Sequence, residues 1–210
     1  MKTAIAAAVA VLILAGGVAA ADRDEMVLAW DDEENPRTIY SVPAEGRQIA
    51  VMFQAPEGFD WLNQIRCYVG NDNQGGATQP FTLTVWAPAD AGDHVIPGQV
   101  IYEYTSGGGY PEELWIQFNA PDYVHVGDSE TFPGRVFFVG VQWMTSAPAL
   151  GVDWDPIVSG KTWQRFASDD WALYPETGNC ACVRAVVTDE EDTSVELRSW
   201  GVVKSSYRTP

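Results

Sequence analysis

The chain has 210 residues and is strongly acidic, with 12 Lys and Arg against 29 Asp and Glu and a formal net charge of −17. Such a charge repels the phosphate backbone of nucleic acids, so no nucleic-acid partner is expected, and anionic membranes are disfavoured for the same reason. A chain of this length can fold into one sandwich or barrel with a complete core.

Residues 1–21 have the pattern of a signal peptide. Lys2 supplies a positive charge, an uncharged apolar stretch runs from Thr3 to Val18, and small residues follow at a cleavage position near Ala21. The apolar stretch is shorter than the ~20 residues that a membrane span needs, so no membrane insertion is expected once the signal is removed. The protein is therefore predicted to be secreted, in the extracellular space or at the cell surface, with the periplasm as an alternative.

Residues 22–188 are predicted to form one all-β domain. Apolar and polar residues alternate with a period of two in residues 48–54, 81–87 and 114–118, and clusters of Gly, Pro, Asn and Asp separate the alternating stretches. About ten to twelve short strands at this spacing predict a sandwich of two antiparallel sheets. Residues 135–144 are apolar on both faces, which favours a central strand.

Three cysteines, Cys67, Cys180 and Cys182, leave an odd thiol in a chain that is expected to meet an oxidising compartment. Cys67 pairs with Cys180 or Cys182 if their strands are neighbours. Strand alternation instead places Cys67 on one face with its apolar neighbours and turns Cys180 and Cys182 outward, because Val183 and Ala185 then point inward. Under that interpretation all three thiols are free, or one forms a bond between molecules.

Residues 189–210 are predicted to form an acidic linker and a C-terminal tail. Thr193 and Glu196 have the spacing of a capping box, and Leu197, Trp200 and Val203 follow at helical intervals. Gly201 weakens such a helix by about 1 kcal/mol relative to alanine. The tail is therefore a short helix or a flexible segment, and it either docks on the sandwich or serves as a recognition or sorting tag.

The order of the motifs PGQVIYEY, FFVGVQW, PALGVDWDP and VRAVV resembles the jelly-roll β-sandwich modules of secreted bacterial peptidases and adhesins. The tail SWGVVKSSYR resembles the Trp-Gly-x-x-Lys-x-x-(Tyr/Phe)-Arg endings of some secreted bacterial proteins. The resemblance covers about residues 26–187 and implies a jelly-roll-like, ancillary binding or adhesion module. It also implies a structural calcium ion, which such modules commonly carry.

No catalytic constellation is visible in the sequence. It contains no G-x-S-x-G elbow, H-E-x-x-H helix or Gly-rich phosphate loop. His94 lies in a Gly/Pro-rich segment and His125 in an apolar one, and both are interpreted as surface or strand residues. We therefore do not expect an enzyme, and a hydrolase is the least favoured alternative.

Clustered carboxylates suggest a calcium site. Calcium takes six to eight oxygen ligands, which Asp31 and Asp32, together with Asp153 and Asp155 in the GVDWDP turn, could supply if the two segments are adjacent. The alternative is that these side chains cap turns through hydrogen bonds to the backbone.

Nine tryptophans suggest a platform for sugar rings. Alternation predicts Trp86 and Trp115 on solvent-facing surfaces, and Trp154 and Trp171 are expected in loops. Trp143 and Trp163 are interpreted as core residues, since tryptophan buries a large apolar area. The leading hypothesis is a non-catalytic module that attaches to a glycan or cell-surface protein. The alternative is a self-assembling component of the cell envelope or extracellular matrix, because exposed aromatics also occur at protein interfaces.

Overall fold

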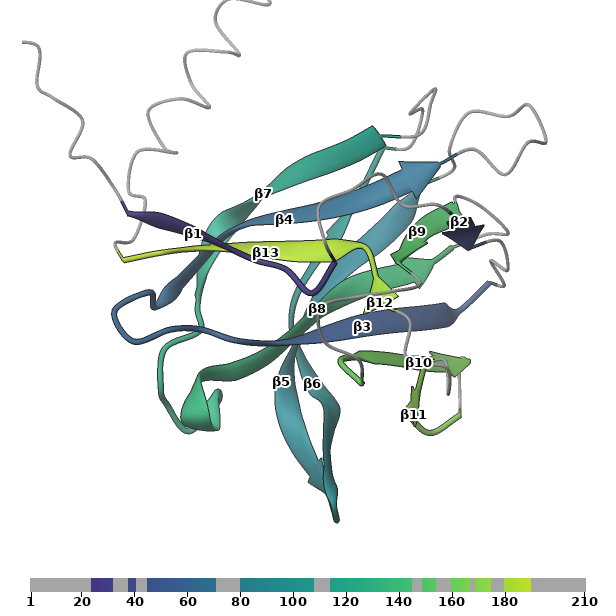
Figure 1. Cartoon of the computed structure of the whole chain (residues 1–210). Coiled ribbons are helices and arrows are strands. Elements are labelled where there is room, and N and C mark those ends of the chain that lie inside the picture. Colours follow the sequence, from purple (N-terminus) through teal and green to yellow (C-terminus); the bar gives the residue numbers. More distant parts are fainter. Residues whose placement is uncertain are drawn as a thin grey trace, which may run out of the picture.

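The computed structural model describes residues 24–31, 38–40, 45–70, 80–107, 114–144, 149–153, 160–166, 169–174 and 180–189. The predicted signal peptide and nearly all of the predicted tail lie outside these residues. Within them the chain is all-β, as predicted, and its two antiparallel sheets pack face to face (Figure 1). In the part of the chain that is described, no helix has the length and apolar character to cross a membrane.

The first sheet has seven strands in the described residues. Its main order is β1-β13-β4-β9-β12, with β2 paired to β9 and β7 paired to β4. Their bounds are β1 Glu25–Leu28, β2 Thr38–Tyr40, β4 Trp61–Gly70, β7 Leu114–His125, β9 Ala149–Asp153, β12 Cys180–Ala181 and β13 Val183–Thr188.

Over the described ranges, the second sheet has six strands in the order β11-β10-β3-β8-β5-β6. Their bounds are β3 Arg47–Gln54, β5 Phe81–Ala91, β6 His94–Thr105, β8 Val136–Trp143, β10 Thr162–Phe166 and β11 Ala172–Leu173. A 3₁₀ turn, η1 (Pro133–Arg135), leads into β8. The β5–β6 hairpin extends beyond the rest of its sheet (Figure 1).

The core lies between the sheets and contains the apolar residues that alternation places inward. Every second residue from Ile49 to Phe53 of β3, from Phe81 to Ala87 of β5 and from Phe137 to Trp143 of β8 is buried there, together with the inward residues of β4, β7 and β13. The predicted inward residues that the structure buries in this core are Ile49, Val51, Phe53, Ile65, Cys67, Val69, Phe81, Leu83, Val85, Ile116, Phe118, Phe137, Val139, Val141, Trp143, Val183, Ala185 and Val187. Burial of a large apolar side chain contributes about 1.5–3 kcal/mol, so this layer accounts for the pairing of the sheets.

Strand β8 is central, as its two apolar faces predict. It pairs with β3 on one side and β5 on the other, and Phe138, on the face away from the core, is fully buried. Gly140 pairs with Ala50 of β3 at a close approach of the two backbones. A Cβ at Gly140 would lie 1.8 Å from the carbonyl oxygen of Ile49, so only glycine fits at this crossing.

The three cysteines are buried and carry free thiols. Cys67 lies in the core as expected, but the outward orientation predicted for Cys180 is wrong, because Cys180 also lies in the core. The reason is a change of partner at Cys182, whose amide donates to Gly151 of β9 and whose carbonyl accepts from Tyr68 of β4. The strand breaks there, so alternation cannot be counted from Val183 back to Cys180.

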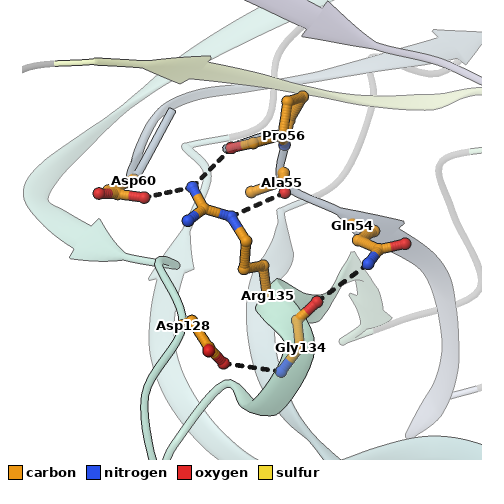
Figure 2. A network of polar contacts seen from close by, with 7 residues as sticks. All are labelled: Gln54, Ala55, Pro56, Asp60, Asp128, Gly134 and Arg135. Carbon is orange, nitrogen blue, oxygen red and sulfur yellow. Dashed lines mark hydrogen bonds and ion pairs between the residues drawn. The ribbon is translucent and has the colours of Figure 1, made fainter. Parts of the chain in front are cut away.

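Arg135, just before β8, bonds to the segment that connects β3 and β4 (Figure 2). It adopts φ 64°, and in the described residues it is the one residue other than glycine with positive φ. Its Nε donates to the carbonyl of Ala55 at 2.9 Å, and its Nη2 donates to Pro56 and to the carboxylate of Asp60. A left-handed conformation costs of order 1 kcal/mol or more for a side-chain residue, and these bonds offset that cost.

Candidate ligand-binding face

A second apolar cluster lies on the outer face of the six-stranded sheet, away from the core. Ala50, Trp86, Phe138 and Trp163 are its buried members, and Trp171 packs against it partly buried. The prediction that Trp86 faces solvent is wrong, because its side chain is 0% exposed. Alternation correctly predicts that the Trp86 side chain points away from the core, but other side chains cover this outer face of the sheet. We call this surface, with Trp86, Trp163 and Trp171, the tryptophan face.

The floor of the tryptophan face is made of small residues. Trp163 of β10 pairs with Ala50, which pairs with Gly140, which pairs with Thr84 of β5. Paired residues of adjacent strands share a face, so this row runs from the indole ring of Trp163 across three small residues, Ala50, Gly140 and Thr84. Ala50 and Thr84 are 0% exposed, so neighbouring side chains cover this row.

Side chains from separate parts of the sequence enclose this floor. The ring of Trp171 meets that of Trp86 edge to face, with centroids 5.6 Å apart. The guanidinium of Arg165 lies 4.7 Å from the centre of the Trp171 ring, in cation–π range. On another side, the imidazole of His94, at the start of β6, lies 5.9 Å from the ring of Trp163.

Four buried polar atoms on the tryptophan face have no hydrogen-bond partner in the part of the chain that the structure describes. They are the indole Nε1 atoms of Trp86, Trp163 and Trp171 and the hydroxyl of Thr84. By contrast, Trp30 donates its Nε1 hydrogen to the carbonyl of Met52 at 2.7 Å. An unsatisfied buried polar group costs about 1–3 kcal/mol, so four such atoms on one face lower the stability of the fold unless a partner is bound.

A polar row borders the floor. Arg165 Nε donates to Gln48 Oε1 at 2.7 Å, and Gln48 Nε2 donates to Gln142 Oε1 at 2.8 Å. The next residues across the sheet, Thr82 and Thr105, face each other with hydroxyl oxygens 3.3 Å apart. The row thus crosses five strands from β10 to β6.

A pocket adjoins the other side of the cluster. Its volume is about 270 Å³, and its lining is Pro88, Asp90, Val95, Pro133 and Val136. Val95 and Val136 also pack against the tryptophan cluster. The pocket therefore lies next to the apolar floor.

The structure separates the predicted sugar-binding tryptophans. Trp86 and Trp171 lie together on the tryptophan face, whereas Trp115 of β7 lies on the outer face of the other sheet. There its ring is covered by the guanidinium of Arg184 at 4.0 Å and meets Tyr68 edge to face at 5.7 Å. Trp154 lies outside the described residues.

Sequence reasoning missed three contributors to the tryptophan face. Trp163 was assigned to the core, and Arg165 and Thr84 were not singled out. The segment KTWQRF contains the signal, since period two places Trp163 and Arg165 on the same face. Which face is covered, and by what, depends on contacts with Trp171 and the β5–β6 hairpin that no local pattern encodes.

Asp31, a predicted calcium ligand, forms a buried ion pair. Its carboxylate accepts from Arg184 Nε at 3.0 and 3.1 Å and also from Nη2, and its side chain is 3% exposed. Asp153 is buried as well. Burial raises the pKa of Cys180, and the charges of Asp31 and Asp153 raise it further, so both carboxylates lie near this thiol. No group of three or more His, Cys, Asp or Glu in the described residues is arranged to hold a metal ion.

Asp32 and Asp155 lie outside the described residues, and the calcium site stays a prediction. The ion pair of Asp31 was not foreseen, although the sequence carries a signal for it. The closing strand VRAVV contains one arginine among apolar residues, and a buried arginine needs a partner.

Burial suppresses the reactivity of the thiols. It raises the pKa of Cys180 to about 12, while a hydrogen bond with Thr162 acts in the opposite direction. Burial also raises the pKa values of Cys67 and Cys182 well above the ordinary range. The thiolate is the nucleophile and the metal ligand, so these thiols are poorly suited to either role at neutral pH.

Comparison of the chain with models of protein families, with curated proteins and with solved structures gives no match.

Proposed function

We propose that this protein is a secreted, non-catalytic binding module that attaches to a glycan of a cell surface or matrix through its tryptophan face. The observation that carries the proposal is the set of four unpartnered buried polar atoms of Thr84, Trp86, Trp163 and Trp171 on one sheet face. Because such atoms are rare without a partner in native proteins, a bound polar ligand accounts for their retention.

The chemistry of the face suits a sugar. A pyranose ring has an apolar face of C–H groups and a rim of oxygens, and Trp171 provides a partly buried aromatic surface beside indole N–H donors. The row of Arg165, Gln48 and Gln142 supplies further polar contacts. Sites for small ligands combine mainly apolar walls with a few convergent polar groups, as this surface does.

The test is retention of the purified mature protein on a panel of neutral and acidic polysaccharides. Replacement of Trp171 by alanine is expected to weaken binding at least tenfold. Trp115→Ala is the matched control, because Trp115 is also a partly buried tryptophan but lies on the other sheet. Binding that is lost with Trp115→Ala and kept with Trp171→Ala contradicts the proposed site, and no binding across the panel contradicts the proposed function.

A second candidate function, self-assembly, is favoured by strand β6. This strand has 12 residues, ends its sheet, and exposes Val100 and Tyr104 by 40% and 42%. An unprotected edge strand can pair with another chain. Concentration-dependent oligomers that disappear in Val100→Lys, with no polysaccharide binding, would support assembly over attachment.

A further inference from the structure

Three of the four unpartnered buried polar atoms of the tryptophan face are indole N–H groups, which can only donate a hydrogen bond. We infer that the glycan it binds carries carboxylate groups, as polymers of uronic acids do. This inference rests on the proposed function and names the class of its ligand.

The polar row has a fixed direction. Arg165 can only donate, so Gln48 must face it with the amide oxygen and offer its NH₂ group to the next residue. Gln142 must then accept with its own oxygen. Each amide oxygen keeps one lone pair, while the NH₂ of Gln142 and the Nη groups of Arg165 are donors with no hydrogen-bond partner among the described residues.

The tryptophans add only donors. An indole N–H cannot accept a hydrogen bond, and three of them lie buried without partners on this face. A sugar hydroxyl that accepts from an indole brings a hydrogen of its own, which then needs an acceptor. A carboxylate brings two oxygens with about four lone pairs and no hydrogen, so it matches the surplus.

Arg165 also lacks a carboxylate partner among the described residues. Its side chain is partly buried, its Nε bonds to a neutral amide, and its guanidinium stacks on Trp171. Burial lowers the pKa of Arg165, which is the direction expected for a cation without a nearby counter-ion. A ligand carboxylate would supply that counter-ion.

The charges of the face are arranged by strand. Glu103 of β6 shares the outer face with Thr84, and Asp90 lines the pocket at the β5–β6 hairpin. Along the sheet, strands β3, β8 and β5 lie between Glu103 and Arg165, whereas His94 at the start of β6 contacts Trp163 of β10. Asp169 and Asp170, which precede Trp171, are exposed. A ligand carboxylate is therefore expected at Arg165 itself. The net charge of −17 repels anions at long range, so recognition depends on these contacts and not on electrostatic steering.

The test compares three acidic polysaccharides, polygalacturonate, alginate and hyaluronate, with their carboxyl-reduced counterparts, which keep the linkages and lose the charge. We expect at least one acidic polymer to bind at least tenfold more tightly than its reduced form, measured by calorimetry. Arg165→Gln should remove most of that preference, and Arg165→Lys should retain part of it. Arg66→Gln, at a partly buried arginine on the other sheet, should change nothing.

The outcomes of this test distinguish the carboxylate inference from the proposed attachment to a glycan. Equal binding of acidic and reduced polymers overturns the carboxylate inference and leaves glycan attachment standing. Retention of the preference in a folded Arg165→Gln variant overturns the claim that Arg165 binds the carboxylate. Absence of binding to every polymer, acidic or neutral, overturns the proposed function itself.

Discussion

Replacing Asp31 by asparagine tests the buried ion pair with Arg184. The two residues are 3% and 9% exposed, and Asp31 accepts from both Nε and Nη2 of Arg184. Breaking a buried pair by removing one charge costs about 3–5 kcal/mol, because the other charge stays buried without a partner. At about 2–4 °C per kcal/mol for a domain of this size, the melting temperature should fall by roughly 10 °C.

The assay is urea unfolding followed by tryptophan fluorescence, for Asp31→Asn, Arg184→Met and the double variant. We expect the double variant to be more stable than the sum of the single losses implies, with a coupling of about 2 kcal/mol, because the apolar replacement leaves no charge buried. Measuring each protein with calcium and with chelator separates the ion pair from a calcium site. A loss below about 1 kcal/mol, or one present only with calcium, would refute the reasoning.

Three further predictions concern the packing of the sandwich. Gly140→Ala should cost about 3 kcal/mol in urea unfolding, because its methyl group would meet the carbonyl of Ile49, whereas Gly107→Ala, with open space around its Cβ position, should cost under 1. Arg135→Gly should be about 1 kcal/mol more stable than Arg135→Ala, since both lose the same hydrogen bonds and only glycine relieves the φ of 64°; equal stabilities would argue against strain. The free energy of unfolding should fall as the pH rises from about 9 to about 12, because the Cys180 thiol keeps its proton in the folded state after it has lost it in the unfolded state. The expected slope from Cys180 alone is about 1.4 kcal/mol per pH unit. Cys180→Val should flatten that slope, and an unchanged slope would contradict the burial of this thiol.

The architecture could be predicted because it follows from a local pattern. In strands β3, β5 and β8, period-two alternation predicted the buried and outward residues, and the structure confirms the inward set. Alternation failed at Cys180, where the chain changes partner between β9 and β4 and the count along one strand no longer applies. Period-two alternation therefore predicts the orientation of side chains within one strand, but not across a point where the chain changes its strand partner.

The candidate site was only partly predictable. Tryptophan content and the position of Trp86 indicated an aromatic surface, but its burial depends on Trp171 and on the β5–β6 hairpin. The sequence analysis does not single out Arg165. Its proposed role as a ligand contact rests on Gln48 and Trp171, which lie on other elements and which only the folded chain brings together.

The indole N–H resonances of the nine tryptophans offer the most direct test of the claim that the tryptophan face is the binding site. In a ¹H–¹⁵N spectrum, a bound polysaccharide fragment should shift the resonances of Trp86, Trp163 and Trp171. Those of Trp143 in the core and of Trp30, already bonded to a carbonyl, should stay in place. Binding that shifts the resonance of Trp115 and leaves the three of the tryptophan face unchanged would contradict the account.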